Sequence, residues 1–363
     1  MFTKINFHNL RCFKDFSLET KTPLTLISGR NNVGKSTALE GISLLCLSGA
    51  PDMFLKVSGI RKYELRATPW QGTVSALDHF HFLLWELLFH EVDMSQPLRI
   101  SATDDAGNSR TLSLQKDEQF SLAQPVGANT NNMLQSLPGA YALRLSYKYN
   151  KKEELGRFHL TQNGLAFNFD APPSLPRPPV TIYASSFSHF PQQLVADWFG
   201  KVEVAGQKSL IVDTLHLLDP EIEDLFISTM QGMGYVYARR KSGRPLPVSA
   251  MGDGTSKLLF YLLAMAANPG CLLLVDEIET GLHHTFYQKL WQAVTSLAQQ
   301  INSQVIATTH SDECIHAAIK GATEVDPALL TYIRFAKEDD AIVPYYFAND
   351  DLTFALEHRM EVR

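Results

Sequence analysis

The sequence lacks features that mark several classes of protein. None of its four cysteines forms a C-x-x-C pair, which argues against a zinc site or a disulfide framework and predicts reduced thiols in a cytoplasmic protein. The N-terminus has no apolar core of a signal peptide, so we expect none. The longest apolar tract, Leu258 to Val275, is interrupted at Asn268-Pro269-Gly270. This interruption predicts a helix, a turn and a buried strand instead of a membrane span, and we expect no membrane partner. The cysteines are Cys12, Cys46, Cys271 and Cys314.

An excess of positive charge and long heptad repeats are also missing. The chain has 32 Lys and Arg against 38 Asp and Glu, a formal net charge of -6, which argues against a protein that coats DNA over its whole surface. Two turns are locally basic, Tyr147 to Lys152 and Ala238 to Arg244, and these are the places where phosphate contacts are possible. Without extended heptads we expect no coiled-coil arm.

The pattern of apolar residues predicts an α/β fold with a mostly parallel core sheet. Residues 1–50 predict an antiparallel β layer, then a buried strand ending at Gly29 and a helix. Residues 51–179 predict a mixed insertion with a helix and antiparallel strands, and residues 180–363 alternate strands with helices. We therefore expect a single domain made of three discontinuous lobes.

Three shorter segments give sharper expectations about local structure. Residues 75–92 (SALDHFHFLLWELLFHEV) predict an amphipathic helix, and residues 213–226 (DTLHLLDPEIEDLF) predict a helix broken by proline. The Asp105-Ala106-Gly107-Asn108 turn predicts a β-hairpin within residues 97–115.

The segment GRNNVGKST, from Gly29 to Thr37, fits the phosphate-loop pattern G-x-x-x-x-G-K-[ST], and it follows a strand and opens a helix, as the motif requires. Gly29 and Gly34 let the backbone wrap around phosphate, Lys35 reaches the β- and γ-phosphates, and Ser36 holds Mg²⁺. The predicted ATP-binding loop is completed by Arg30, Asn31, Asn32, Val33 and Thr37.

Two further strands end in residues suited to nucleotide hydrolysis. CLLLVDEIETGLHH, from Cys271 to His284, places Asp276 at a strand end, where an acid supports Mg²⁺, and Glu277 beside it as a general base. QVIATTHSDE, from Gln304 to Glu313, places His310 at the edge where ligands bind in open α/β sheets.

A second glycine-rich loop lies far from the first in the sequence. In SAMGDGTSKL, Gly252, Asp253 and Gly254 run into Thr255 and an apolar helix, so backbone N–H groups are presented to an anion. The chain therefore has two loops suited to phosphate.

Taken together, these segments resemble the ATP-binding-cassette type of P-loop ATPase, and more narrowly its RecF/SMC/OLD-like branch in the small stand-alone AAA-type form found in prokaryotic defence systems. The resemblance rests on INFHNLRCFKDFSLE, ISGRNNVGKSTALEGI, LLLVDEIETGLHH and IATTHS. It covers residues 2–45 and 245–315, about a third of the chain.

The resemblance implies a fold, a cofactor and a self-association. In this family two heads sandwich two nucleotides, and the phosphate loop of one head faces a signature loop of the other. The loop from Gly252 to Thr255 occupies the signature position, with Gly252 where a serine is usual. Residues 279–283 occupy the D-loop position, which implies communication across the dimer. The remaining positions that the family suggests are Gln192 or Gln193 for its glutamine loop, and Arg11 and Phe13 at the border of the nucleotide.

The mechanism expected on this basis is ATP hydrolysis with Mg²⁺ in a head-to-tail homodimer or a larger assembly of dimers. Lys35, Ser36 and Asp276 bind ATP and Mg²⁺, Glu277 orients water and His310 stabilises the γ-phosphate. Three roles compete for this switch. One is control of a separate effector chain, a nuclease or toxin; another is RecF-like DNA repair with direct DNA binding; the third is a transporter subunit, which the long insertion disfavours.

Overall fold

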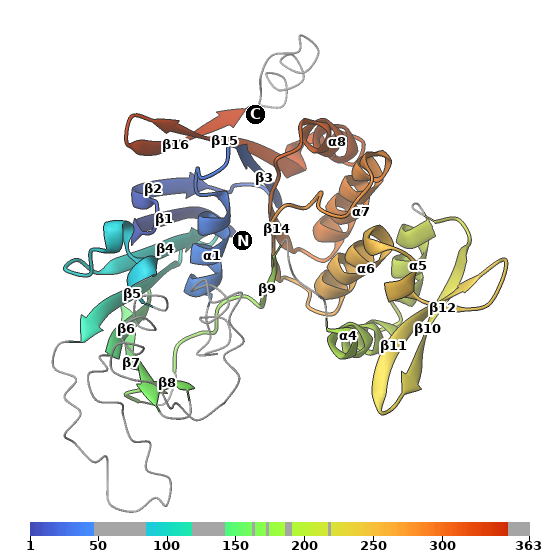
Figure 1. Cartoon of the computed structure of the whole chain (residues 1–363), viewed down its shortest axis with the longest axis horizontal. Coiled ribbons are helices and arrows are strands. Elements are labelled where there is room, and N and C mark those ends of the chain that lie inside the picture. Colours follow the sequence, from blue (N-terminus) through green and yellow to red (C-terminus); the bar gives the residue numbers. More distant parts are fainter. Residues whose placement is uncertain are drawn as a thin grey trace, which may run out of the picture.

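The computed structural model describes residues 1–46, 85–117, 142–161, 164–171, 174–185, 191–216 and 219–347. Within these residues the chain forms three β-sheets with helices between and beside them (Figure 1). The predicted α/β class is confirmed, and no described helix exceeds 14 residues, so the described part contains no coiled-coil arm.

The central sheet has six strands and is parallel except at one edge. Its order is β16-β15-β3-β14-β13-β9, and β16 alone runs antiparallel to its neighbour. This confirms the predicted mostly parallel core sheet. The strands are β3 (Leu24–Gly29), β9 (Thr181–Ala184), β13 (Leu272–Val275), β14 (Gln304–Thr308), β15 (Leu330–Glu338) and β16 (Ala341–Phe347).

The second sheet has seven antiparallel strands in the order β2-β1-β4-β5-β6-β7-β8. The N-terminal pair and the strands of the insertion thus belong to one sheet, because β4 pairs directly with β1. The division of the chain into three lobes stays a prediction. The strands are β1 (Phe2–Leu10), β2 (Phe13–Glu19), β4 (Leu98–Asp104), β5 (Ser109–Asp117), β6 (Ala142–Tyr149), β7 (Lys152–Thr161) and β8 (Gly164–Phe169).

The hairpin predicted within residues 97–115 is formed by β4 and β5. Asp104 closes its turn, since one carboxylate oxygen accepts the N–H groups of Ala106 at 3.0 Å and Asn108 at 2.8 Å. Gly107 has φ 80°, a left-handed conformation that glycine adopts without strain.

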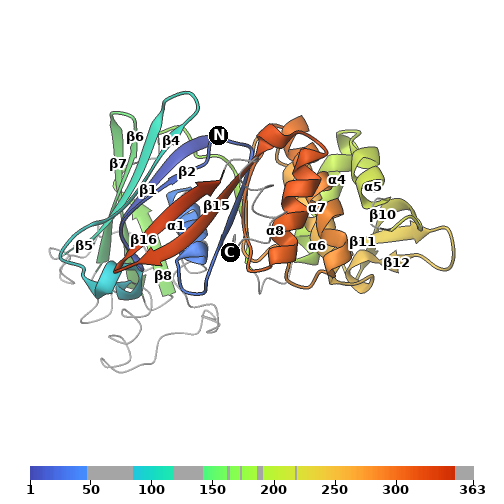
Figure 2. The same ribbon diagram turned by 90° about the horizontal axis from the view of Figure 1, so that it is seen from above.

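Helix α1 (Lys35–Leu45) lies between the two large sheets. Because side chains alternate along a strand, the central sheet presents one set of apolar residues to α1 and another to its opposite face. Ile27, Leu272 and Leu274 share a buried cluster with α1 and the seven-stranded sheet. Figure 2 shows α1 on one side of β3, with the other helices on the far side. Those helices include α6 (Asp253–Ala266), α7 (Tyr287–Gln300) and α8 (Asp312–Thr323).

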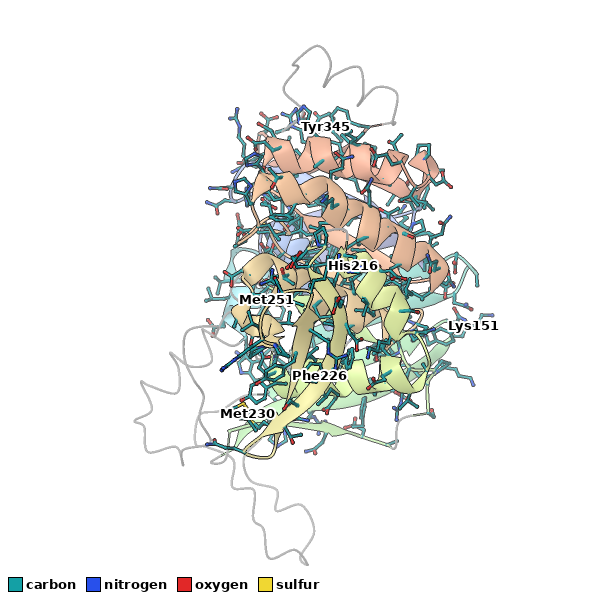
Figure 3. The ribbon with its side chains drawn as sticks, turned by 90° about the vertical axis from the view of Figure 1, so that its right-hand side faces the viewer. Lys151, His216, Phe226, Met230, Met251 and Tyr345 are labelled. Carbon is teal, nitrogen blue, oxygen red and sulfur yellow. The ribbon has the colours of Figure 1, made fainter. Side chains whose placement is uncertain are left out.

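A small third sheet extends from the helical side. It contains β10 (Ile222–Met230), β11 (Met233–Arg240) and β12 (Leu246–Pro247), and it packs on α4 (Gln192–Val204) and α5 (Lys208–His216). Figure 3 faces this part of the molecule, and Phe226 and Met230 mark β10.

The predicted helix over residues 213–226 is wrong in its second half. Helix α5 ends at His216, residues 217 and 218 lie outside the described part, and Ile222 already belongs to β10. The side chains of Leu225, Val236 and Ala238 are buried between the hairpin and α4 and α5. Pairing with β11 therefore overrides the local helical pattern.

The predicted helix over residues 75–92 is also wrong in its described part, which begins at residue 85. Two short 3₁₀ turns are found instead, Glu86–Leu88 and His90–Val92. Positive φ angles at Glu91 (49°) and Val92 (62°) are incompatible with a continuing helix. The segment is held against the β1–β2 turn, where the N–H of His90 donates to the side-chain oxygen of Asn9 at 3.1 Å.

The apolar tract from Leu258 to Val275 has the predicted form. It comprises the rest of α6, a turn at Asn268 to Gly270 and strand β13. No helix in the described part of the chain is long and apolar enough to cross a membrane.

Candidate functional site

The phosphate loop is held in shape by two glycines that no other residue could replace without strain. Gly29 has φ 138° and Gly34 has φ 84°, both in the region that glycine favours. A Cβ on Gly29 would lie 2.3 Å from the carbonyl oxygen of Phe335, and one on Gly34 would lie 2.6 Å from the ring of Phe13. The loop is therefore packed tightly from beneath while its upper residues, Arg30 to Asn32, are exposed.

Lys35 occupies the middle of this loop. Its Nζ donates to the carbonyl oxygens of Gly29 at 2.6 Å and Arg30 at 2.9 Å, and the residue is 5% exposed. The ammonium group thus lies at the N-terminus of α1, where the N–H groups of the first turn and the helix dipole also favour an anion. The geometry suits the phosphates of a nucleotide.

Ser36 and Asp276 meet at the carboxyl end of the central sheet, as the sequence predicts. The hydroxyl of Ser36 donates to Oδ1 of Asp276 at 3.0 Å, and the hydroxyl of Thr308 donates to the same oxygen at 2.7 Å. A hydroxyl and one carboxylate, completed by phosphate and water oxygens, fit the hard-oxygen coordination of Mg²⁺. Asp276 is 4% exposed and therefore rigidly placed.

Glu277 follows Asp276 in a strained conformation. Its φ is 49°, which costs energy for a residue other than glycine, and its N–H donates to the hydroxyl of Thr308 at 2.8 Å. The hydroxyl of Thr280 donates to Oε2 of Glu277 at 3.1 Å. The left-handed turn directs the Glu277 side chain toward His310, with 3.5 Å between Oε1 and Nε2.

His310 lies between Lys35 of the phosphate loop and Glu277. Its Nδ1 is 3.3 Å from Nζ of Lys35, while its Nε2 faces Glu277. The imidazole is 34% exposed and the Glu277 carboxylate 36%, so both groups are open to a ligand. A lysine, a carboxylate and an imidazole thus converge where the phosphate loop ends.

The second glycine-rich loop lies on the opposite face of the central sheet from α1. Gly252 has φ 106° and begins α6, and both Gly252 and Asp253 are exposed. Its neighbours come from the segment after Glu277: a Cβ on Gly254 would lie 2.9 Å from Leu282, and one on Gly281 would lie 3.3 Å from Asp253. Helices α1 and α6 thus pack on opposite faces of the central sheet.

Three residues suggested by the family resemblance lie elsewhere in contacts of their own. The ring of Phe13 is buried beneath Gly34 and stacks on Phe16 with 4.3 Å between ring centroids, so it supports the loop from below. The guanidinium of Arg11 forms an ion pair with Glu40 of α1. The side-chain oxygen of Gln193 accepts the N–H of Gly234 at 2.8 Å, which fixes this side chain to the third sheet.

Sequence reasoning missed Thr308 and Lys257, and it placed Glu279 only in the D-loop region, with no contact to His310. Thr308 binds both Asp276 and the N–H of Glu277, and this role depends on the pairing of β13 with β14. Glu279 accepts the N–H of His310 at 2.6 Å. Lys257 donates to the carbonyl oxygen of Thr280. The two threonines that precede His310 at a strand end were the available signal for Thr308, whereas Lys257 had none.

Three of the seven cations in the two basic turns lie beside acids. Arg239 lies 3.7 Å from Asp224, Arg240 lies 3.6 Å from Asp219, and Lys148 lies 3.6 Å from Glu153. These cations already have partners.

A phosphate loop after a buried parallel strand, with two acids directly after another strand of the same sheet, defines the chain as a P-loop ATPase. The family model described as "AAA domain, putative AbiEii toxin, Type IV TA system" matches residues 95–315, and a model described as "AAA domain" matches residues 4–76. The chain belongs to this AAA family, and the site fits the RecF/SMC/OLD-like branch that the sequence resembles.

The curated relatives agree with this class. A protein named ATP/GTP phosphatase from Helicobacter pylori (strain ATCC 700392 / 26695) is 23% identical over 400 residues, which cover 98% of this chain and 100% of the relative. The ABC-type organic anion transporter ABCA8B of Mus musculus is 34% identical over 64 residues, 18% of this chain and 4% of the transporter. The expected ATPase activity is thus supported over the full length of the first relative.

Among solved structures, an SMC head domain with an extended coiled coil, bound to the C-terminal domain of ScpA and derived from Pyrococcus furiosus, is similar over 99% of both chains. Its sequence identity is 10% and its TM-score 0.48, so it carries no argument about function.

Proposed function

We propose that this ATPase is a switch in which two copies close head-to-tail around ATP and thereby control a partner effector chain. The observation that carries the proposal is the position of the Gly252–Thr255 loop. It is suited to receive an anion, yet it begins a helix on the face of the central sheet opposite α1, which follows the phosphate loop of its own chain. A second copy supplies the phosphate that this loop is suited to bind.

Within each site, each residue has a different role in binding or hydrolysis. Lys35 and the N–H groups at the start of α1 hold the β- and γ-phosphates. Ser36 and Asp276 would hold Mg²⁺, which supplies charge neutralisation between the phosphates. Glu277 accepts a hydrogen bond from the attacking water and takes its proton, and His310 donates to the γ-phosphate. The second copy contributes N–H groups of the Gly252–Thr255 loop and the hydroxyl of Thr255.

The effector is proposed to be a separate chain with toxin or nuclease activity. This proposal is supported by the toxin–antitoxin description of the matching family. Hydrolysis would then reopen the dimer and change the surface available to that chain. A cytoplasmic location is part of the same proposal.

The test uses Glu277→Gln, which keeps the shape of the side chain and removes its basicity. Incubated with ATP and Mg²⁺, this variant is expected to double in mass by size exclusion with light scattering, because hydrolysis no longer separates the two copies. Lys35→Ala in the same background is the matched control and stays monomeric. A Glu277→Gln protein that remains monomeric with saturating ATP refutes the sandwich.

Subunit mixing tests the contribution of one copy to the site of the other. Lys35→Ala and Thr255→Arg proteins are each expected to be inactive, whereas an equal mixture recovers about a quarter of the wild-type rate. Half of the random dimers are mixed, and each of these has one intact composite site of two. Activity of the mixture that equals the mean of the separate proteins would mean that each chain works alone.

Direct DNA binding is the competing proposal and has weaker support. Arg239 and Arg240 form ion pairs with Asp224 and Asp219, so a phosphate would have to displace them. Lys241 and Arg244 are the exposed cations left at that turn.

A further inference from the structure

Glu279 lies behind the catalytic groups, and its side chain contacts the main chain of one of them. It follows Asp276 by three positions, in the turn after β13. The segment is fixed at both ends, because the N–H of Ile278 donates to the carbonyl of Thr308 at 3.0 Å and the N–H of Leu282 donates to the carbonyl of Glu279 at 3.0 Å. The Glu279 carboxylate therefore has a defined origin and direction.

One oxygen of this carboxylate holds the main chain of His310. Oε1 of Glu279 accepts the His310 N–H at 2.6 Å, a short distance typical of a charge-assisted hydrogen bond. The preceding residue is fixed as well, since the N–H of Thr309 donates to the carbonyl of Ile27 at 3.0 Å. Beyond Thr309 the strand has ended, so the hydrogen bond to Glu279 is the contact that sets where the His310 backbone lies.

The position of that backbone determines what the imidazole can reach. The two ring nitrogens lie at the outer limit of contact, 3.3 Å from Lys35 Nζ and 3.5 Å from Glu277 Oε1. A shift of His310 by about 1 Å toward one partner would lengthen the contact with the other beyond hydrogen-bond range, and misplacement of that size costs about 100-fold in rate in enzymes generally.

The second oxygen points into the protein interior. Oε2 of Glu279 is buried and has no hydrogen-bond partner within the described part of the chain. The nearest cation of α6 is Lys257, which donates to the carbonyl of Thr280 and interacts electrostatically with Glu279. Glu279 thus lies between the helix that begins with the second glycine loop and the histidine that faces the first.

We infer that Glu279 is a positioning residue for ATP hydrolysis, which accepts the main-chain N–H of His310 and so holds the imidazole between Lys35 and Glu277. The inference rests on the proposed role of His310 in the reaction. Glu279 itself touches neither the phosphate loop nor Ser36, so it acts on the rate of the chemical step rather than on nucleotide affinity.

The test is a double-mutant cycle on the steady-state ATPase of the full chain. Glu279→Leu removes the acceptor at similar size and is expected to lower kcat by about 10- to 100-fold, with the KM for ATP within about threefold of wild type. His310→Ala is expected to lower kcat by about 100-fold. The double variant should be no slower than His310→Ala within about threefold, because Glu279 has no effect without the side chain that it positions. If the Leu variant is insoluble, Glu279→Ala takes its place in the cycle.

A conservative variant tests whether Glu279 acts through its hydrogen bond to His310 or through its charge. Glu279→Gln retains an acceptor oxygen, so it should restore at least about a third of the wild-type kcat. A Gln variant as slow as the Leu variant, or losses that multiply in the double variant, overturns the positioning role while leaving His310 in place. If His310→Ala has normal kcat, the proposed function of His310 fails first, and the inference about Glu279 falls with it.

Discussion

Replacing Gly34 with alanine tests how tightly the phosphate loop is packed from below. The added Cβ would lie 2.6 Å and 2.7 Å from two ring carbons of Phe13 and 2.8 Å from Sγ of Cys12. The Phe13 ring is 1% exposed and stacks on Phe16 at an interplanar angle of 7°, so it has no space to move into. Overpacking of this kind costs about 1–3 kcal/mol, and the left-handed φ of 84° costs alanine about 1–2 kcal/mol more.

The expected loss for Gly34→Ala is therefore about 2–5 kcal/mol in the free energy of unfolding. Gly107→Ala is the matched control, because Gly107 has a similar φ of 80° but nothing within 4 Å of an added Cβ. The Gly107→Ala protein should lose only the part that is caused by the left-handed φ, about 1–2 kcal/mol in the free energy of unfolding. Urea unfolding followed by fluorescence measures both. Phe13→Leu added to Gly34→Ala should recover part of the loss. Equal destabilisation by the two alanine variants would refute the packing argument.

Three further predictions concern the surface and the nucleotide. Lys35→Ala should weaken ATP binding by about 100-fold or more by calorimetry, because a charged donor to phosphate is lost; unchanged affinity would contradict the site. Burial raises the pKa of the Cys12 thiol above its ordinary value, so iodoacetamide labelling of the native protein should accelerate as pH rises and should reach Cys12 before the three buried cysteines. Peptide mapping that finds another cysteine labelled first would contradict this order. Charge reversal at the turn after β11 should leave DNA affinity at low salt unchanged, whereas a large loss would support the DNA-binding alternative; the residues are Arg239, Arg240, Lys241 and Arg244.

The phosphate loop could be predicted from the sequence because its chemistry is local. Gly29, Gly34 and Lys35 act through backbone freedom and charge within nine residues, so one motif contains them all. The acids at Asp276 and Glu277 were equally visible, since a buried strand directly precedes them. Their roles stay predictions.

The role of Thr308 could not be predicted from the sequence, because it depends on a contact between strands that are far apart in the chain. Thr308 reaches Asp276 only because β14 pairs with β13 in a particular register, with Val275 opposite Ala307. The wrong helix over residues 222–226 has a different cause, since β10 pairs with β11, which begins only at Met233, and this hairpin overrides the local helical pattern. Local pattern cannot report a partner that lies elsewhere in the chain.

The shared sheet beneath α1 limits how this protein can be divided or rebuilt. Because β4 pairs directly with β1, the strands after residue 97 are part of the sheet that covers α1 in the nucleotide-binding half. They do not form a separate unit that could be removed. Cutting them out would expose the buried face of α1, including Leu39 and Ile42, to water. Modular exchange between such ATPases would therefore have to transfer the whole seven-stranded sheet together with α1, whereas the hairpin of β10 and β11 shares the core of the helical half and would have to move with α4 and α5.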